Sequence, residues 1–421
     1  MRILLRVAAG LAAELMVSRG LALLGAVLIL AGCASLGPQL PMSGMDATAS
    51  EELSFGVRTL DANGQFEILS SRAVARRLQS RFGSRPLTVL ALSSGGANGA
   101  FGAGALAGVS RGGARPQYTV VTGVSTGALV APFAFLGPAW DAEMIRIFTT
   151  GATDDLLRHR ALGVFFGSSV YSGAPLRQLI DRYADGTMIA AIAAQAAKGR
   201  LLLVATTDLS TGEPVIWDLG SIALHGGGHA EPLIQSVLLA SASVPGMLPP
   251  VVVRFRRRGG MRTETHVDGG VTLPFFIAPE PQDLPRSTAV VRVIIDGSLR
   301  NLPRPTHASA LSIFRRSLAA GLSRMTRTQL EATMAALRRR GIGFDYAAIP
   351  DSYPLEGSFD FSTQAQRSLF EYALTCAAKG QLWIDGRSQS ATAVGALPPS
   401  SANQMCPAGD AFFERLAALN D

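Results

Sequence analysis

The sequence predicts an α/β protein in which helices cover both faces of a mostly parallel β-sheet. Short, almost wholly apolar runs such as residues 87–92 are typical of strands that are buried on both faces. These runs alternate along the chain with helical patterns, which is the order expected of a parallel sheet. The chain has 421 residues, enough for one large domain of this class.

The elements follow from the spacing of apolar residues along the chain. Strands are expected at residues 87–92, 118–122, 201–207, 214–217, 251–255, 263–267 and 289–295. Helices are expected at residues 73–82, 99–109, 128–136, 175–183, 231–241, 307–340 and 363–379. Pro132 should bend the helix at residues 128–136. The helix at residues 307–340 could be continuous or broken into two.

Both ends of the chain differ in composition from the predicted domain at residues 55–387. Residues 1–32 combine early arginines with an apolar run that is too short to span a bilayer, which indicates a signal peptide. The run ends in Leu-Ala-Gly-Cys, which resembles a bacterial lipobox and implies lipidation of Cys33. Residues 33–54 are expected to be a flexible tether and residues 388–421 a loosely ordered tail.

The predicted location is therefore the cell envelope, with a lipid anchor in the membrane and the domain exported. Ala34 after the cysteine favours the outer membrane, facing the periplasm. The formal charge of +7 comes almost entirely from arginine, and no basic patch carries interleaved aromatic residues, so nucleic acid is excluded as a partner. Cys376 and Cys406 could form a disulfide in an oxidising compartment or remain two buried thiols.

Ser125 lies in a Gly-Val-Ser-Thr-Gly segment, Gly123 to Gly127, between a predicted strand and a predicted helix. Glycines on both sides allow a sharp turn that lifts the hydroxyl above the sheet, as in a nucleophilic serine. A capped glycine-rich turn explains this motif equally well when it is considered alone.

Two further motifs, one before and one after the Ser125 segment, favour the interpretation of that segment as part of a catalytic site. The glycine-rich loop at residues 95–99 follows a predicted strand and precedes a predicted helix. Its backbone amides could therefore bind a negatively charged oxygen. A phosphate-binding loop is the alternative, but the Gly-Lys-Ser/Thr ending of such a loop is absent. Asp268, followed by two glycines, ends another strand. A tight Asp-Gly turn is the alternative for that motif.

Together these motifs resemble the patatin-like phospholipase family. Two other blocks support the resemblance, Thr-Asp-Leu-Ser-Thr-Gly-Glu-Pro at residues 207–214 and Ala-Ser-Ala-Ser-Val-Pro-Gly-Met-Leu-Pro-Pro at 240–250. The resemblance covers roughly residues 87–295. It implies a three-layer α/β/α fold, Ser125 as nucleophile, Asp268 as its base, and an oxyanion hole formed by the amides of Gly95, Gly96 and Ala97.

The chain departs from the family pattern at two loop positions. Ser94 stands where the family usually has its first glycine, and Asn98 stands where an arginine or lysine is common. Ser94 removes no backbone N–H, so the hole can survive. The loss of the cation could alter the preference for anionic substrates.

The histidines offer alternative functional residues. His307 follows Asp268 in the order of a Ser-acid-His triad but carries no motif, and His225 and His229 could supply two metal ligands or belong to a flexible loop. His266 precedes Asp268 by two residues and is expected either at the surface or beside the proposed site residues. No metal and no cofactor are predicted.

Arginines crowd the hairpin before Asp268. This run is expected to be either a solvated turn or a contact for lipid head groups; it comprises Arg254, Arg256, Arg257, Arg258 and Arg262.

The predicted function is hydrolysis of acyl esters in phospholipids or lysophospholipids by Ser125 and Asp268, with the membrane reached through the lipid anchor. A non-catalytic envelope lipoprotein that keeps a hydrolase fold is the alternative from another class. A general carboxylesterase or thioesterase shares the same chemistry and differs only in substrate.

Overall fold

At the centre of the sheet, strands run parallel to one another in the order β10-β9-β3-β4-β5. Their bounds are β3 Leu87–Leu92, β4 Val120–Val124, β5 Leu201–Asp208, β9 Ala289–Ile295 and β10 Gly343–Ala348. The computed structural model describes residues 56–386 apart from 153–168, 258–259, 286–288, 301–304, 352, 356 and 358–359. The predicted signal peptide, the tether with Cys33 and the C-terminal tail lie outside the described residues.

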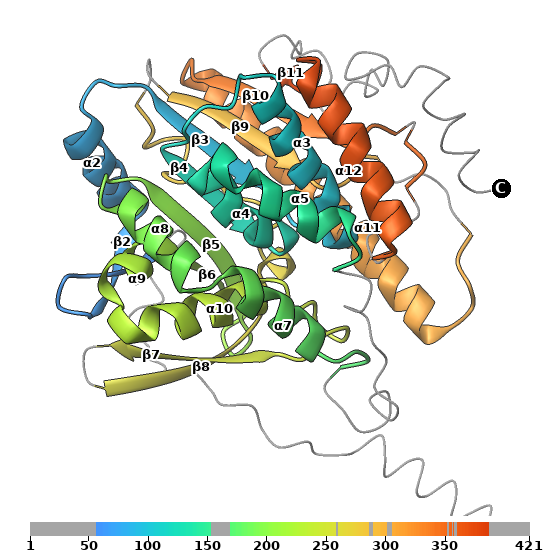
Figure 1. Ribbon diagram of the computed structural model, residues 1–421, viewed down its shortest axis with the longest axis horizontal. Coiled ribbons are helices and arrows are strands. Elements are labelled where there is room, and N and C mark those ends of the chain that lie inside the picture. The colour runs from blue at the N-terminus through green and yellow to red at the C-terminus, as the bar shows by residue number, and fades with distance from the viewer. Residues whose placement is uncertain are drawn as a thin grey trace, which may run out of the picture.

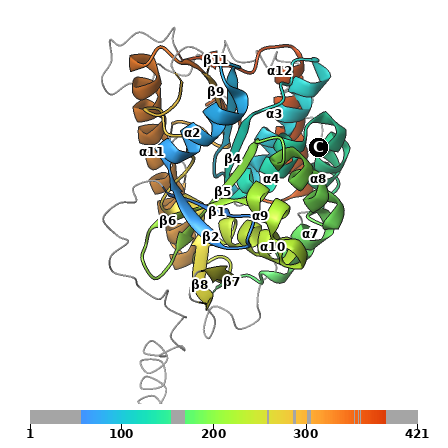
Figure 2. The same ribbon diagram turned by 90° about the vertical axis from the view of Figure 1, so that its left-hand side faces the viewer.

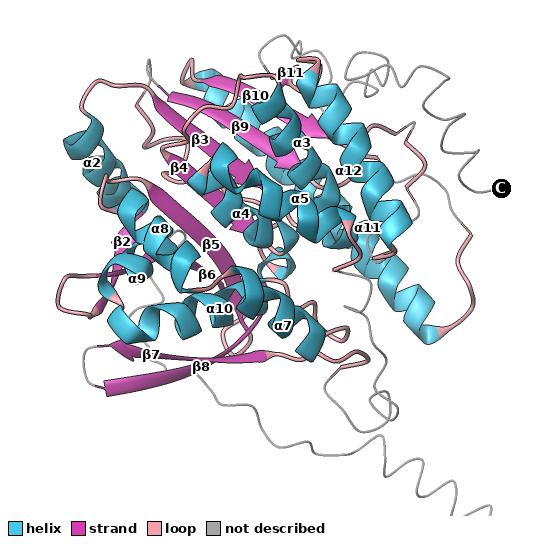
Figure 3. Ribbon diagram, in the orientation of Figure 1, coloured by secondary structure: helices cyan, strands magenta, loops and turns pink. Residues whose placement is uncertain are grey.

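Antiparallel pairs extend the sheet at both edges. On one side β11 (Ile384–Asp385) pairs with β10. On the other side β6 (Pro214–Asp218) pairs antiparallel with β5, β1 (Gly56–Leu60) follows parallel to β6, and β2 (Phe66–Ser70) closes the edge. The hairpin of β7 (Val251–Arg257) and β8 (Gly260–Asp268) projects from the end of β5, as Figure 3 shows.

Helices cover both faces of the sheet and complete the three layers (Figures 1 and 2). One face carries α3 Gly99–Arg111, α4 Thr126–Leu136, α5 Asp141–Thr149, α7 Ala174–Tyr183, α8 Gly186–Ala196, α9 Leu219–His225, α10 Ala230–Ser241 and α12 Thr363–Ala378. The opposite face carries α2 Ser71–Phe82 and α11 Ala310–Arg339.

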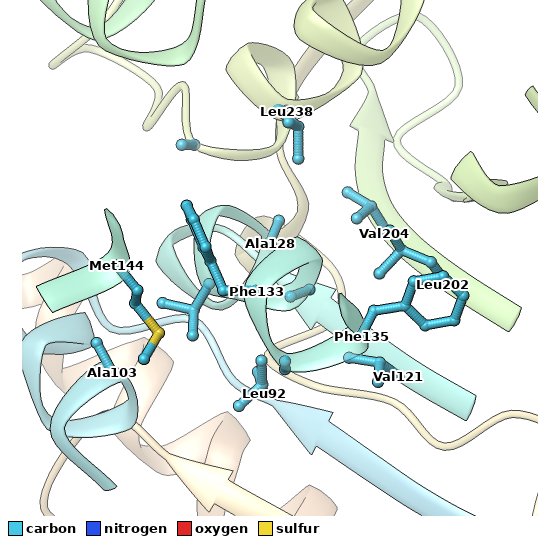
Figure 4. Packing of buried hydrophobic residues seen from close by; sticks show 14 of the residues in the cluster. Leu92, Ala103, Val121, Ala128, Phe133, Phe135, Met144, Leu202, Val204 and Leu238 are labelled. Carbon is cyan, nitrogen blue, oxygen red and sulfur yellow. The ribbon is translucent and has the colours of Figure 1, made fainter. Parts of the chain in front are cut away.

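The two cores alternate along the central strands, because successive side chains of a strand point to opposite faces. In β3, Leu90 and Leu92 are buried with α3 and α4, whereas Val89 and Ala91 are buried with α2 and α11. Figure 4 shows the first core, with Phe135 of α4 directed toward Leu202 of β5. Burial of each such large side chain stabilises the fold by about 1.5–3 kcal/mol.

The structure confirms the predicted fold class and most elements, with some differences in their bounds. The strand predicted at residues 118–122 is shifted to Val120–Val124, so that it runs directly into Ser125. The helix predicted at 307–340 is one continuous element that starts at Ala310, because the Ser309 hydroxyl caps it by accepting a hydrogen bond from the N–H of Ser312.

The topology brings two strand ends together beside β5. Along one edge of β5, β4 runs up to Val124, which pairs with Ala205. The next residue of β5, Thr206, pairs on this same edge with Asp268, the last residue of β8. On the opposite edge of β5, Thr206 pairs with Val215 of β6. Strands β4 and β8 therefore meet head to head along one edge of β5, and the residues at their ends become neighbours.

Candidate active site

Ser125 occupies a sharp turn between β4 and α4. Among the described residues it is the only non-glycine residue with a positive φ, 56°, in a region that is unfavourable for L-residues. Any side chain at Gly127 would collide with the sheet, since its Cβ would lie 2.5 Å from the carbonyl oxygen of Leu92. The small residue is needed for the turn that presents the Ser125 side chain at the end of the strand.

Ser241 holds the backbone of this turn. Its hydroxyl accepts a hydrogen bond from the N–H of Ser125 at 3.0 Å and donates one to the carbonyl oxygen of Ala205 at 2.7 Å. Sequence reasoning did not single out Ser241, although it lies inside the residue 240–250 block that supported the family resemblance.

The side chains of Ser125 and Asp268 are in direct contact. The Ser125 hydroxyl donates a hydrogen bond to Oδ2 of Asp268 at 2.6 Å, and both residues are buried. The second carboxylate oxygen, Oδ1, accepts a hydrogen bond from the N–H of Gly270 at 2.7 Å. The first glycines after Asp268 thus turn the chain back so that an amide fixes the carboxylate.

Burial raises the pKa of Asp268 to about 7, and the hydrogen bonds from Ser125 and Gly270 oppose the shift without reversing it. A carboxylate with a pKa near the operating pH is suited to accept and return a proton. This pair can therefore move the hydroxyl proton of Ser125 without a histidine.

The glycine-rich loop lies beside the same hydroxyl. Gly96 has φ 59° and starts a 3₁₀ turn, Gly96–Asn98, whose N-cap residue Gly95 offers no side-chain cap. The Thr126 hydroxyl donates a hydrogen bond to the carbonyl oxygen of Gly96 at 2.6 Å. Since the carbonyl and N–H of a trans peptide point in opposite directions, the N–H of Ala97 is directed away from Thr126.

The amides of this loop remain available for a ligand. Within the described part of the chain, no backbone hydrogen bond outside the regular elements uses the N–H of Gly95, Gly96 or Ala97. First-turn N–H groups have no partner inside their own helix. Ser94 does not disturb the loop, because its N–H donates to the carbonyl oxygen of Pro274 at 2.8 Å.

Asp296 follows β9 and packs against the glycine-rich loop at residues 95–99. The sequence did not predict this residue as part of the site. Its Oδ1 accepts a hydrogen bond from the N–H of Gly102 at 2.8 Å, and its own N–H donates to the Ser93 hydroxyl at 2.9 Å. Burial raises its pKa well above the usual range. Gly95 packs directly on it, because a Cβ there would lie 2.3 Å from Asp296 Cβ.

Two pockets meet at Ser125, and Gly96 borders both. The first, here called the apolar pocket, has an empty volume of about 790 Å³, including its mouth. Its walls are almost entirely hydrophobic; they include Leu129, Phe133, Ile147, Phe148, Leu176, Leu179, Met247 and Leu248. The second, here called the polar pocket, contains Asp268, Asn98 and two arginines.

The histidines take no part in the hydrogen bond between the Ser125 hydroxyl and Asp268. His266 is fully buried, where it contacts the Thr206 hydroxyl at 3.0 Å and the Glu264 carboxylate at 3.0 Å. His307 is exposed. His225 ends α9, and His229 belongs to the short 3₁₀ turn, Gly227–His229, that leads into α10, so this segment joins two helices. Among the described residues, no group of three or more His, Cys, Asp or Glu side chains could hold a metal ion.

The arginines of the β7–β8 hairpin are only partly accessible. Arg254 and Arg256 are exposed on β7, whereas Arg257 and Arg262 are half-buried. Arg258 lies outside the described residues.

Of the two cysteines that could form a disulfide, Cys406 also lies outside the described residues. Cys376 itself is buried and is half of a disulfide.

Comparison with known proteins supports this description of the domain. Residues 90–279 match the family model described as patatin-like phospholipase, which places a domain of that type in this part of the chain. The crystal structure of VipD from Legionella pneumophila is similar with 12% sequence identity and a TM-score of 0.30, over 78% of this chain and 71% of that chain. No curated protein sequence matches the chain significantly.

The fold is thus an α/β fold of the patatin-like type, and the family match at residues 90–279 agrees with a hydrolase of lipid acyl esters.

Proposed function

We propose that the protein is a serine esterase that cleaves acyl chains from glycerophospholipids or lysophospholipids, with Ser125 as nucleophile and Asp268 as base. The observation that carries the proposal is the 2.6 Å hydrogen bond from the buried Ser125 hydroxyl to a carboxylate whose pKa is about 7. The patatin-like domain at residues 90–279 agrees with this reaction class.

In the proposed reaction, Asp268 takes the hydroxyl proton as Ser125 Oγ attacks the acyl carbonyl carbon. Amides of Gly95, Gly96 and Ala97 stabilise the oxyanion that forms. Asp268 then gives its proton to the leaving alcohol oxygen, the ester bond breaks, and an acyl-enzyme remains. Water attacks this acyl group, Asp268 accepts the proton of the water, and the fatty acid leaves as Ser125 regains its hydrogen.

The apolar pocket is the proposed binding site for the acyl chain. It begins at Ser125 and Gly96, and its aliphatic and aromatic walls offer almost no hydrogen-bond partners. An acyl chain gains about 0.8 kcal/mol for each buried CH₂ group, so such a pocket favours long-chain esters over short ones. This preference would distinguish a lipid acyl hydrolase from a general carboxylesterase.

We further propose that Cys33 is lipidated and that the domain works at the membrane of the cell envelope. None of the helices in the described part of the chain is both long and apolar enough to cross a membrane. Palmitate should be incorporated into the wild-type protein and be absent from Cys33→Ser.

Fluorophosphonate labelling tests the proposed chemistry directly. The probe should label the wild-type protein but not Ser125→Ala, and ester hydrolysis should fall by about 10⁴-fold or more in Ser125→Ala and nearly as much in Asp268→Asn. Ser236→Ala, at a half-buried serine of α10 whose hydroxyl bonds only within its own helix, is the matched control and should keep both activities.

Two results would redirect the assignment. Hydrolysis at the wild-type rate by Ser125→Ala would exclude this serine as nucleophile, and near-wild-type turnover of Asp268→Asn would point to another base. A folded wild-type protein that neither reacts with the probe nor cleaves esters would favour the non-catalytic lipoprotein.

A further inference from the structure

Thr126, the residue after the proposed nucleophile, contacts the glycine-rich loop with both branches of its side chain. Its hydroxyl donates a hydrogen bond to the carbonyl oxygen of Gly96 at 2.6 Å. Its methyl carbon packs against Gly99, where a Cβ would lie only 2.0 Å from Thr126 Cγ2. The side chain therefore contacts both ends of the 3₁₀ turn, Gly96–Asn98, and the residue that follows it.

The hydroxyl bond acts on one peptide unit of the loop, the unit that joins Gly96 to Ala97. Because a trans peptide is planar, the direction of the Gly96 carbonyl determines the direction of the Ala97 N–H. The carbonyl faces Thr126, so the N–H faces the opposite side. In the described part of the chain, no backbone hydrogen bond outside the regular elements uses this N–H, and Ala97 borders the apolar pocket together with Ser125.

Within the loop itself, this peptide unit is held only loosely. Gly96 has no side chain and a positive φ of 59°, so steric repulsion restricts its backbone less than that of any other residue type. Its carbonyl also accepts a hydrogen bond from the N–H of Gly99, but that N–H is shared with the carbonyl of Ala97. The Thr126 hydroxyl instead holds the carbonyl from another element, the first turn of α4.

The surroundings of Thr126 show why a hydroxyl at this position is significant. The residue is only 8% exposed and borders the apolar pocket. Valine, which has the same shape, would pack equally well there. A hydroxyl in apolar surroundings costs free energy unless it is hydrogen-bonded, and this one bonds to the carbonyl that lies opposite the Ala97 amide.

We infer that Thr126 is a positioning residue of the oxyanion hole: its hydroxyl holds the Gly96–Ala97 peptide so that the Ala97 N–H points at the oxyanion. This inference rests on the proposed function and adds to it the residue that orients one of the donors. Oxyanion donors act where charge develops in the transition state, so their misalignment lowers kcat and leaves substrate binding unchanged. Through Thr126, the turn that carries Ser125 also fixes the loop opposite it.

Two substitutions at Thr126 separate the role of the hydroxyl from that of the methyl group. Thr126→Val keeps the methyl contact with Gly99 and removes the hydroxyl, whereas Thr126→Ser keeps the hydroxyl and removes the methyl. On a soluble short-chain ester, Thr126→Val should lower kcat about 10- to 100-fold, somewhat less than the outright loss of one donor. KM should stay within about twofold in this variant, and Thr126→Ser should keep kcat within about threefold of the wild type.

Thr122→Val is the matched control, because the buried Thr122 hydroxyl of β4 donates a hydrogen bond of the same length, 2.6 Å, to the carbonyl oxygen of Phe276. This change removes an equivalent bond in the strand that leads to Ser125, but outside the loop. It should lower the unfolding temperature at least as much as Thr126→Val and keep kcat within about threefold. Unchanged kcat in Thr126→Val, a larger loss in Thr126→Ser, or an equal loss in Thr122→Val would overturn the positioning role.

Crystal structures of the variants separate the orientation of this peptide from activity. The Gly96 carbonyl should point toward residue 126 in the wild type and in Thr126→Ser, and should turn away from it in Thr126→Val. If this pattern is found while the wild-type protein cleaves no ester, the positioning contact stands and the proposed hydrolysis fails. If Thr126→Val keeps the wild-type orientation, the positioning role is wrong whatever the activity.

Discussion

The carboxyl group of Asp268 lies at the buried end of β8, where burial raises its pKa to about 7. Only the ionised form can accept the Ser125 proton. Because the ionised fraction increases as pH rises through this pKa, kcat/KM should rise with pH, pass its midpoint near 7 and level off above about pH 8. At pH 5 it should be about a hundredfold below the plateau.

A pH profile of kcat/KM on a neutral ester measures this limb, since kcat/KM reports groups of the free enzyme. An uncharged substrate removes any contribution from substrate ionisation. Circular dichroism at each pH should show a folded protein throughout. An ascending limb near pH 4, where an ordinary aspartate titrates, would contradict the role of burial at this residue.

The residues at the site differ in how far the sequence reveals them. Ser125 and Asp268 stand out because both sit beside glycines that a tight turn requires. Ser241 carries no such local pattern, and Asp296 is followed by a single glycine, Gly297, instead of two. They matter through contacts with distant residues, Ser241 with Ser125 and Asp296 with Gly102, and those contacts exist only after the sheet has formed.

At the scale of elements, α3 and α12 pack so closely that they fix the loop that precedes α3. Gly104 has no room for a side chain, because a Cβ there would lie 2.2 Å from the carbonyl oxygen of Phe370. Gly108 is restricted in the same way by Leu374, at 2.3 Å. The loop at residues 95–98 leads directly into this tightly held helix.

Gly104→Ala should therefore lower the free energy of unfolding by about 1–3 kcal/mol, the usual penalty for overpacking. Gly321→Ala is the matched control: Gly321 lies in α11, and a Cβ there meets nothing within 4 Å. That change should raise the free energy of unfolding by about 0.5–1 kcal/mol, because alanine favours helix. Urea denaturation measures both, and equal signs for the two substitutions would refute the packing argument.

Elements with long apolar runs were the easiest to predict. β3 and β9 have the bounds expected from the sequence, since each is buried on both faces by covering helices. β10 was missed because Gly343 and Asp345 interrupt its apolar residues, and it gains strand geometry from pairing with β9. α5 and α8 were missed as well: α5 has only nine residues, and α8 is an alanine-rich segment of eleven residues, and each packs against a neighbouring helix.

At the scale of the whole molecule, the proposed anchor and the site have to act on one membrane. The proposed tether, residues 33–54, would reach up to about 75 Å if fully extended. If Cys33 is lipidated as proposed, a chain of this length would keep the domain near the bilayer and would let its pockets turn toward the lipid. Substrate binding then becomes an intramolecular encounter with a high effective concentration.

Cys33→Ser should separate membrane delivery from chemistry. Without the proposed lipid anchor, hydrolysis of phospholipid in vesicles should fall by about tenfold or more at low protein concentration, because the domain must find the bilayer by diffusion. Hydrolysis of a soluble short-chain ester should stay within about twofold of the wild type, since Ser125, Asp268 and both pockets lie in the described domain. Initial rates on both substrates measure the ratio. Parallel losses on both would instead show that Cys33 supports the fold of the domain, and unchanged rates on vesicles would remove the anchor from the mechanism.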